Sequence, residues 1–131
     1  MKKFFVLILL SMLGFIESKA IQVVNNSACD ICVLRICYDA TCRISSETWY
    51  FVAAGNTLIV PDCSPANCTA YKLVTGASRL EDCENTSGPG ITIASTAFSG
   101  CGNGTCPQFP QFDSICDVTA TVVNPTLLQI Q

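Results

Sequence analysis

Ten cysteines and no histidine define the side-chain chemistry open to this chain of 131 residues. The lack of histidine excludes Ser-His and Cys-His catalytic arrangements, and it excludes every zinc site that requires imidazole. The first two cysteines, Cys29 and Cys32, form a C-x-x-C pair, which is the spacing of a redox dithiol. A redox dithiol is one interpretation of this pair, and structural disulfide bonding is the other.

The residues around the C-x-x-C pair favour structural disulfide bonding. A redox dithiol works best at a helix N-terminus, whereas Cys32 leads directly into an apolar segment with a strand pattern. An even number of cysteines in an exported chain predicts complete pairing, although the spacing does not determine the connectivity. The cysteines that we expect to form disulfide bonds are Cys29, Cys32, Cys37, Cys42, Cys63, Cys68, Cys83, Cys101, Cys106 and Cys116.

Acidic residues form the second group with potential chemistry. Glu81, Asp82 and Glu84 crowd one polar stretch, and Asp113 and Asp117 form a separate pair. Paired carboxylates can hydrolyse glycosides and clustered ones can bind calcium. The sequence, however, fixes no carboxylate separation and contains no D-x-D-x-D-G loop. We therefore predict no catalytic residue, no metal and no cofactor, and we interpret the acidic stretch as a solvated loop.

Three consecutive aromatic residues, Trp49, Tyr50 and Phe51, are the candidate binding surface. They occupy a segment with strand character, in which alternate residues point to opposite faces. Exposed aromatic side chains on a strand can stack on sugars or anchor a protein interface. The alternative is that these residues belong to the core, with one tyrosine half exposed.

Four N-x-S/T sequences are possible glycosylation sites if the source is eukaryotic. They begin at Asn25, Asn67, Asn85 and Asn103. The sequence does not distinguish a eukaryotic from a bacterial source, so glycosylation stays open.

Residues 1–20 have the pattern of a cleaved secretory signal peptide. Lys2 and Lys3 precede an apolar segment at 4–16, and Ala20 ends a short segment suited to signal peptidase. The apolar segment would span only about 20 Å as a helix, less than the ~30 Å hydrocarbon core of a bilayer. We therefore predict a signal peptide at 1–20 and a single disulfide-stapled β domain at 21–131, with no membrane span in the mature chain.

Short strand patterns bounded by Gly, Pro, Asn, Asp or Ser recur along the mature chain, and helical periodicity is scarce. The expected strands cover residues 21–24, 32–38, 48–52, 57–60, 69–75, 91–96, 116–123 and 126–130. Residues 53–56 predict a hairpin turn, and 77–83 could form a short helix. This pattern predicts an all-β fold, namely a small, disulfide-rich, antiparallel β-sandwich or barrel of about 7–8 short strands.

The composition limits the possible functions. Half of the residues are hydrophobic and only 13% are charged, so the chain is not disordered, and a net charge of −3 gives no reason to expect nucleic acid. We predict a non-catalytic binding module for a protein or glycan partner. It would act outside the cell or at its surface, or in the periplasm of a bacterium.

Two alternative functions stay open. One is a structural subunit of an extracellular assembly, in which the apolar residues 126–131 are exchanged between subunits by strand donation. Pairing of this segment within its own domain is the ordinary expectation. The other is a secreted thiol-redox or hydrolytic enzyme, which requires a reactive cysteine or convergent carboxylates.

Overall fold

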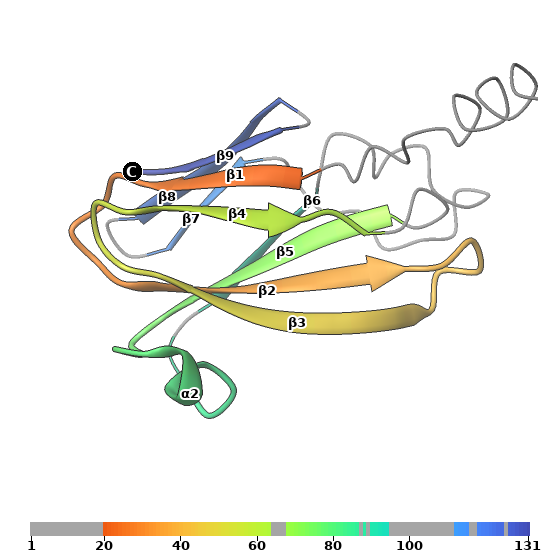
Figure 1. The fold of residues 1–131 in the computed structure, drawn as a ribbon, viewed down its shortest axis with the longest axis horizontal. Coiled ribbons are helices and arrows are strands. Elements are labelled where there is room, and N and C mark those ends of the chain that lie inside the picture. The colour runs from red at the N-terminus through yellow and green to blue at the C-terminus, as the bar shows by residue number, and fades with distance from the viewer. Residues whose placement is uncertain are drawn as a thin grey trace, which may run out of the picture.

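The computed structural model describes residues 20–63, 68–86, 88, 90–94, 112–115, 118–124 and 126–131. In these ranges the chain forms nine strands and one short helix, and the strands make two facing sheets (Figure 1). The predicted fold class, a small all-β sandwich with disulfide bonds, is confirmed. The predictions for residues 1–19 of the signal peptide and for Asn67, Asn103, Cys101, Cys106 and Cys116 lie outside the described residues.

One sheet has five strands and the other has four. In spatial order, the five-stranded sheet consists of β4 (Thr57–Pro61), β1 (Ala20–Asn25), β9 (Leu127–Ile130), β8 (Val118–Asn124) and β7 (Phe112–Ile115). The four-stranded sheet consists of β3 (Ile44–Val52), β2 (Ile31–Tyr38), β5 (Cys68–Thr75) and β6 (Gly90–Ala94). The helix α2 (Leu80–Cys83) lies between β5 and β6 in the chain. Within the described part, no helix is long and apolar enough to cross a membrane.

The core lies between the two sheets and follows from the alternation of side chains along each strand. In β1, Ile21 and Val23 are buried, whereas Gln22 between them is exposed. The fully buried Leu128 and Ile130 of β9 show the same period of two. Burying each such aliphatic side chain contributes about 1.5–3 kcal/mol, so this alternation stabilises the sandwich.

Residues 53–56 form a tight turn, but they do not form the predicted hairpin. The Asn56 N–H donates to the Ala53 carbonyl at 3.0 Å, and Gly55 takes a positive φ of 74°. However, β3 pairs with β2, whereas β4 pairs with β1 in the other sheet. The turn therefore carries the chain from one sheet to the other. Val52 and Val60, on either side of it, are both buried in the core.

The hairpin in this region joins β2 to β3 through residues 39–43. The Asp39 carboxylate accepts hydrogen bonds from the N–H and hydroxyl groups of Thr41 and from the N–H of Arg43. These bonds, the one from the Thr41 side chain first, lower the pKa of Asp39. Cys42 has a φ of 64°, in the left-handed region. Because this turn ends at Arg43, β3 begins at Ile44, four residues before the start of the expected strand at 48–52.

The predicted antiparallel arrangement holds for every pair of neighbouring strands in the described ranges except one. β1 and β9 are parallel, with Gln22 opposite Leu127 and Asn25 opposite Ile130. A parallel pair cannot be joined by a short turn, so its two strands come from distant parts of the chain. The sequence contains strand signals for both segments, but it does not indicate that they pair.

Asn25 is completely buried at the end of β1 and bonds to the opposite sheet. Its Nδ2 donates to the carbonyl oxygens of Val52 at 3.0 Å and Cys29 at 2.8 Å. Its Oδ1 accepts from the N–H and hydroxyl of Ser27. In the folded chain, Nδ2 of Asn25, the atom that would carry a glycan, is therefore buried and bonded to two carbonyl oxygens. Asn85, by contrast, is exposed.

Replacing Asn25 with alanine is expected to destabilise the fold by about 2–3 kcal/mol, because the buried carbonyl of Val52 loses its side-chain donor. Urea unfolding would measure this loss. The matched control, Asn85→Ala at an exposed position, should change stability by less than about 0.5 kcal/mol. Equal unfolding midpoints for Asn25→Ala and the wild type would contradict a bridging role for Asn25.

Candidate functional site

Six described cysteines are disulfide-bonded, which confirms that this is a disulfide-rich scaffold. They are Cys32, Cys37, Cys42, Cys63, Cys68 and Cys83. One bond joins Cys32 of β2 to Cys83 of α2, at a sequence separation of 51. A second joins Cys37 of β2 to Cys63, just after β4. These two bonds fasten β2, an inner strand of the four-stranded sheet, to the helix α2 and to the chain segment that follows β4 of the other sheet.

The C-x-x-C pair is not a dithiol in the folded chain. Cys32 is bonded to Cys83, and Cys29 is an exposed free cysteine. This arrangement contradicts the redox interpretation of the pair, and it differs from the expectation that Cys29 is bridged. That expectation came from the parity of the cysteine count, which does not determine which sulfur atoms the fold brings together.

The three aromatic residues of β3 do not form one surface. Tyr50 packs against the core between the sheets. Trp49 and Phe51 lie on the other face of the strand, where both pack against the cluster around the Cys32–Cys83 bond. All three side chains are half-buried. The structure therefore separates Tyr50 from the candidate surface and keeps Trp49 and Phe51 together on the outer face.

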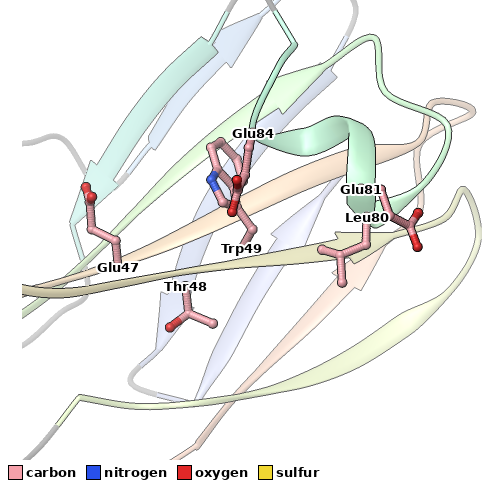
Figure 2. Close-up of a pocket in the computed structure, with 6 residues that line it drawn as sticks. All are labelled: Glu47, Thr48, Trp49, Leu80, Glu81 and Glu84. Carbon is pink, nitrogen blue, oxygen red and sulfur yellow. The ribbon is translucent and has the colours of Figure 1, made fainter.

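The outer face of β3 and the helix α2 form a pocket of about 450 Å³, which we name the β3–α2 pocket (Figure 2). Its lining residues are Glu47, Thr48, Trp49, Leu80, Glu81 and Glu84. Figure 2 shows Glu47 and Trp49 projecting from one side of β3 and Thr48 from the other. Two features that the sequence presented separately, an aromatic residue and an acidic stretch, thus line one pocket. Their meeting depends on the pairing of Cys83 with Cys32, which the spacing of the cysteines does not determine.

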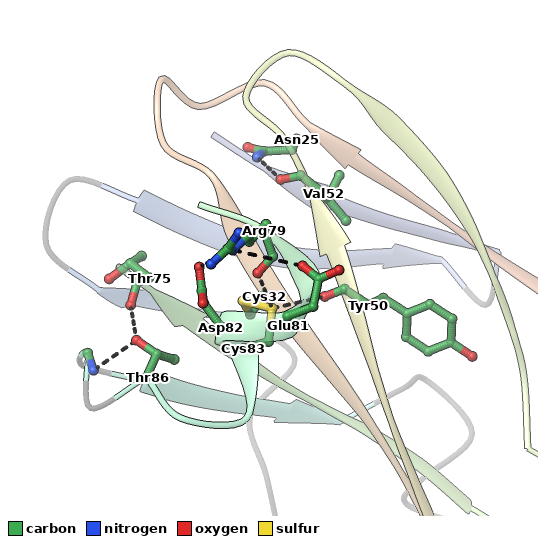
Figure 3. The surroundings of a disulfide bond; sticks show 11 residues. Asn25, Cys32, Tyr50, Val52, Thr75, Arg79, Glu81, Asp82, Cys83 and Thr86 are labelled. Atoms are coloured by element: carbon green, nitrogen blue, oxygen red, sulfur yellow. Dashed lines mark hydrogen bonds and ion pairs between the residues drawn. A yellow bond between two sulfur atoms is a disulfide. The ribbon is translucent and has the colours of Figure 1, made fainter. Parts of the chain in front are cut away.

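The Cys32–Cys83 bond fixes α2 against the sheet (Figure 3). Both cysteines are 1% exposed, and together with Val74 and Ala77 they form a small apolar cluster. A helix of four residues is not stable on its own, because the conformational entropy lost in forming the first turn exceeds the stabilisation from its few hydrogen bonds. The disulfide and this cluster therefore determine where the helical wall of the pocket lies.

Carboxylates dominate the charge of the β3–α2 pocket, since three glutamates line it and no lysine or arginine does. Nε of Arg79 lies 4.0 Å from Oε2 of Glu81 and 3.0 Å from Oδ2 of Asp82. No ion pair to Glu47 or Glu84 occurs within the described ranges. Leu80 is 48% exposed, so an aliphatic surface accompanies the acidic groups.

A second polar cluster lies around Arg35. Its Nη1 donates to the Pro61 carbonyl at 2.8 Å, and its Nη2 donates to the Thr48 hydroxyl at 3.1 Å. The guanidinium carbon lies 5.9 Å from the centroid of the Tyr50 ring. Because Pro61 belongs to the opposite sheet, these contacts hold the two sheets together. We interpret the cluster as structural.

The buried phenol of Tyr71 accompanies this cluster. Burial, and secondarily the Asp62 carboxylate, raise the pKa of Tyr71 well above its usual range. The Asp62 carboxylate itself accepts a hydrogen bond from the Thr69 hydroxyl. A phenol held neutral in this way is a packing group and a poor proton donor or acceptor near neutral pH.

The geometry of the β3–α2 pocket suits binding. An aromatic ring, an aliphatic side chain and several carboxylates on a fixed frame can hold a ligand by contact and charge. In the part of the chain that the structure describes, no group of three or more Cys, Asp or Glu side chains is placed to hold a metal ion. Comparison of the chain with protein-family models, curated proteins and solved structures found no match.

Proposed function

We propose that the protein is a secreted, non-catalytic interaction module that binds a partner at the β3–α2 pocket. The observation that carries this proposal is the pocket itself, in which Trp49 and Leu80 lie beside three carboxylates. Tryptophan is among the residues most enriched where binding energy concentrates. The disulfide bonds are consistent with an oxidising compartment outside the cytosol.

A binding role accounts better for the described residues than catalysis does. With Cys32 bonded to Cys83, the C-x-x-C pair has no second thiol for dithiol chemistry. In the pocket, Leu80 is 48% exposed and the Glu81 side chain is 79% exposed, so water is not excluded as it is from a typical catalytic site. A rigid, open pocket loses little conformational entropy when a partner binds, which favours association.

A photo-crosslinking experiment at two exposed positions tests the proposed function. Benzoylphenylalanine replaces Leu80 in the pocket, or Ile59 on β4, which is 58% exposed and serves as the matched control. The secreted full-length chain is irradiated in its native extracellular fluid. We expect one discrete cross-linked product from position 80, lost on Trp49→Ala, and none from position 59. Equal cross-linking from both positions, or none from position 80, would contradict the proposal.

A further inference from the structure

We infer that the β3–α2 pocket receives a lysine or arginine side chain from a basic segment of a partner protein. This inference rests on the proposed function and adds the chemistry of the partner. It is carried by the combination of a cavity, an indole ring on its wall and an unbalanced negative charge. A glycan is the main competing ligand, and the experiment below separates the two.

The charge of the pocket selects for a cation. Glu47 lies on β3, whereas Glu81 lies on α2 and Glu84 directly follows it, so the lining carboxylates belong to two separate segments of the chain. Arg79 is paired with Glu81 and Asp82 on the exposed side of the helix. Lys72, the basic residue on β5, lies opposite Leu34 of β2 and does not line the pocket.

The apolar lining selects for a cation with a long aliphatic stem. A lysine or arginine side chain carries its charge at the end of several methylene groups, which bind favourably against apolar surfaces. Leu80 offers such a surface, and the Trp49 ring offers both apolar contact and cation–π attraction, for which tryptophan is the best aromatic residue. A neutral sugar could stack on Trp49 but would gain nothing from the net charge, and an acidic sugar would be repelled.

The size and the frame of the pocket fit side chains of a peptide segment. A volume of about 450 Å³ lies in the lower half of the range of small-ligand sites, roughly 300–1,000 Å³. The Cys32–Cys83 bond holds the helical wall in place before the ligand arrives. The net charge of −3 on the whole chain attracts basic partners over a longer range and speeds their association.

Trp49 gives a direct test, because it is the only tryptophan in the chain and it lines the pocket. The full-length secreted protein is titrated with capped tetralysine, capped tetraglutamate or a neutral chitooligosaccharide while tryptophan emission is followed. We expect a saturable change with tetralysine alone. Raising the salt from about 50 to 500 mM should weaken it strongly, because screening acts on exposed charges. No response to tetralysine, or an equal response to either other probe, would overturn the inference.

Variants that each remove one negative charge show whether tetralysine binds at the pocket. Glu47→Gln and Glu84→Gln should each weaken tetralysine binding by about three- to fivefold, as expected for one partly exposed ion pair. The matched control is Asp30→Asn, which removes one negative charge outside the pocket and keeps the oxygen that accepts from the Ala54 N–H. It should leave binding within about twofold of the wild type. An equal loss in all three variants would show that net charge alone attracts the probe, and would overturn the inference.

The two proposals can fail separately. If position 80 cross-links one partner through a neutral or acidic segment and tetralysine does not bind, the proposed function stands and the inference about a basic partner is wrong. If tetralysine binds at Trp49 but position 80 yields no partner, the chemistry of the pocket stands and the proposed function is wrong.

Discussion

Deleting residues 126–131 is expected to leave the chain unable to fold. This segment contains β9, which lies between β1 and β8 in the five-stranded sheet. Its side chains Leu128 and Ile130 are both fully buried. Even truncation of one such residue to alanine costs about 2–5 kcal/mol, whereas a whole domain is stable by only about 5–15 kcal/mol. The deletion also removes the hydrogen-bonding partner of both neighbouring strands.

Urea unfolding followed by near-ultraviolet circular dichroism would measure this effect. Gln131→Ala, which alters only an exposed side chain at the same end, is the control and should unfold like the wild type. A truncated chain that keeps a cooperative transition at the wild-type midpoint would show that β9 is dispensable. In the structure, β9 pairs with β1 and with β8 of its own chain.

Replacing both Cys32 and Cys83 with alanine is expected to destabilise the protein by about 4 kcal/mol and to open the pocket. The bond closes a loop of 51 residues, and the entropy of such a loop in the unfolded chain gives this magnitude. The bond also holds α2 against β3, so the variant should expose Trp49 to solvent. Urea unfolding measures the first effect, and quenching of tryptophan fluorescence by iodide measures the second.

The Cys37–Cys63 bond provides the matched control, because it has a sequence separation of 26 and neither of its cysteines lines the pocket. Its double alanine variant should lose about 3.5 kcal/mol by the same entropy estimate while leaving the accessibility of Trp49 unchanged. If both double variants expose Trp49 equally, the Cys32–Cys83 bond has no special part in forming the pocket.

Local patterns were sufficient to predict the class of the fold. Alternation of buried and exposed residues, as at Ile21 and Val23, identified the segments that form strands. Turn residues identified where those strands end, and Gly55 does take the positive φ that a turn requires. These features depend on neighbours in sequence, and they are therefore readable from the sequence.

The pairing of strands was not predictable in the same way. The turn at 53–56 has the composition of a hairpin, yet β3 and β4 belong to different sheets. Whether a turn reverses the chain within one sheet or carries it to another depends on which distant strands occupy the neighbouring positions. Here β2 lies beside β3 and β1 lies beside β4. Those contacts have no local signature.

The site was predictable only in parts. Trp49 was one of three aromatic residues considered for a binding surface or for the core, and Glu81 and Glu84 were assigned to an acidic stretch. Their meeting in one pocket depends on the partner of Cys83, and the connectivity of ten cysteines cannot be determined from their spacing. The burial of Asn25 was equally hidden, because an N-x-S sequence carries no information on accessibility.

The parallel pairing of β1 with β9 affects the order in which the two sheets can form, because the ribosome makes the chain from its N-terminus. Gln22 of β1 lies about 105 residues before its partner Leu127 of β9, so β1 is synthesised well before the strand that pairs with it. At about 5–20 residues per second, that interval lasts roughly 5–20 s. Cys32 and Cys83 are both synthesised before β9. Their disulfide bond can therefore form while the five-stranded sheet still lacks its middle strand. The Cys32–Cys83 bond can thus form before the sandwich closes.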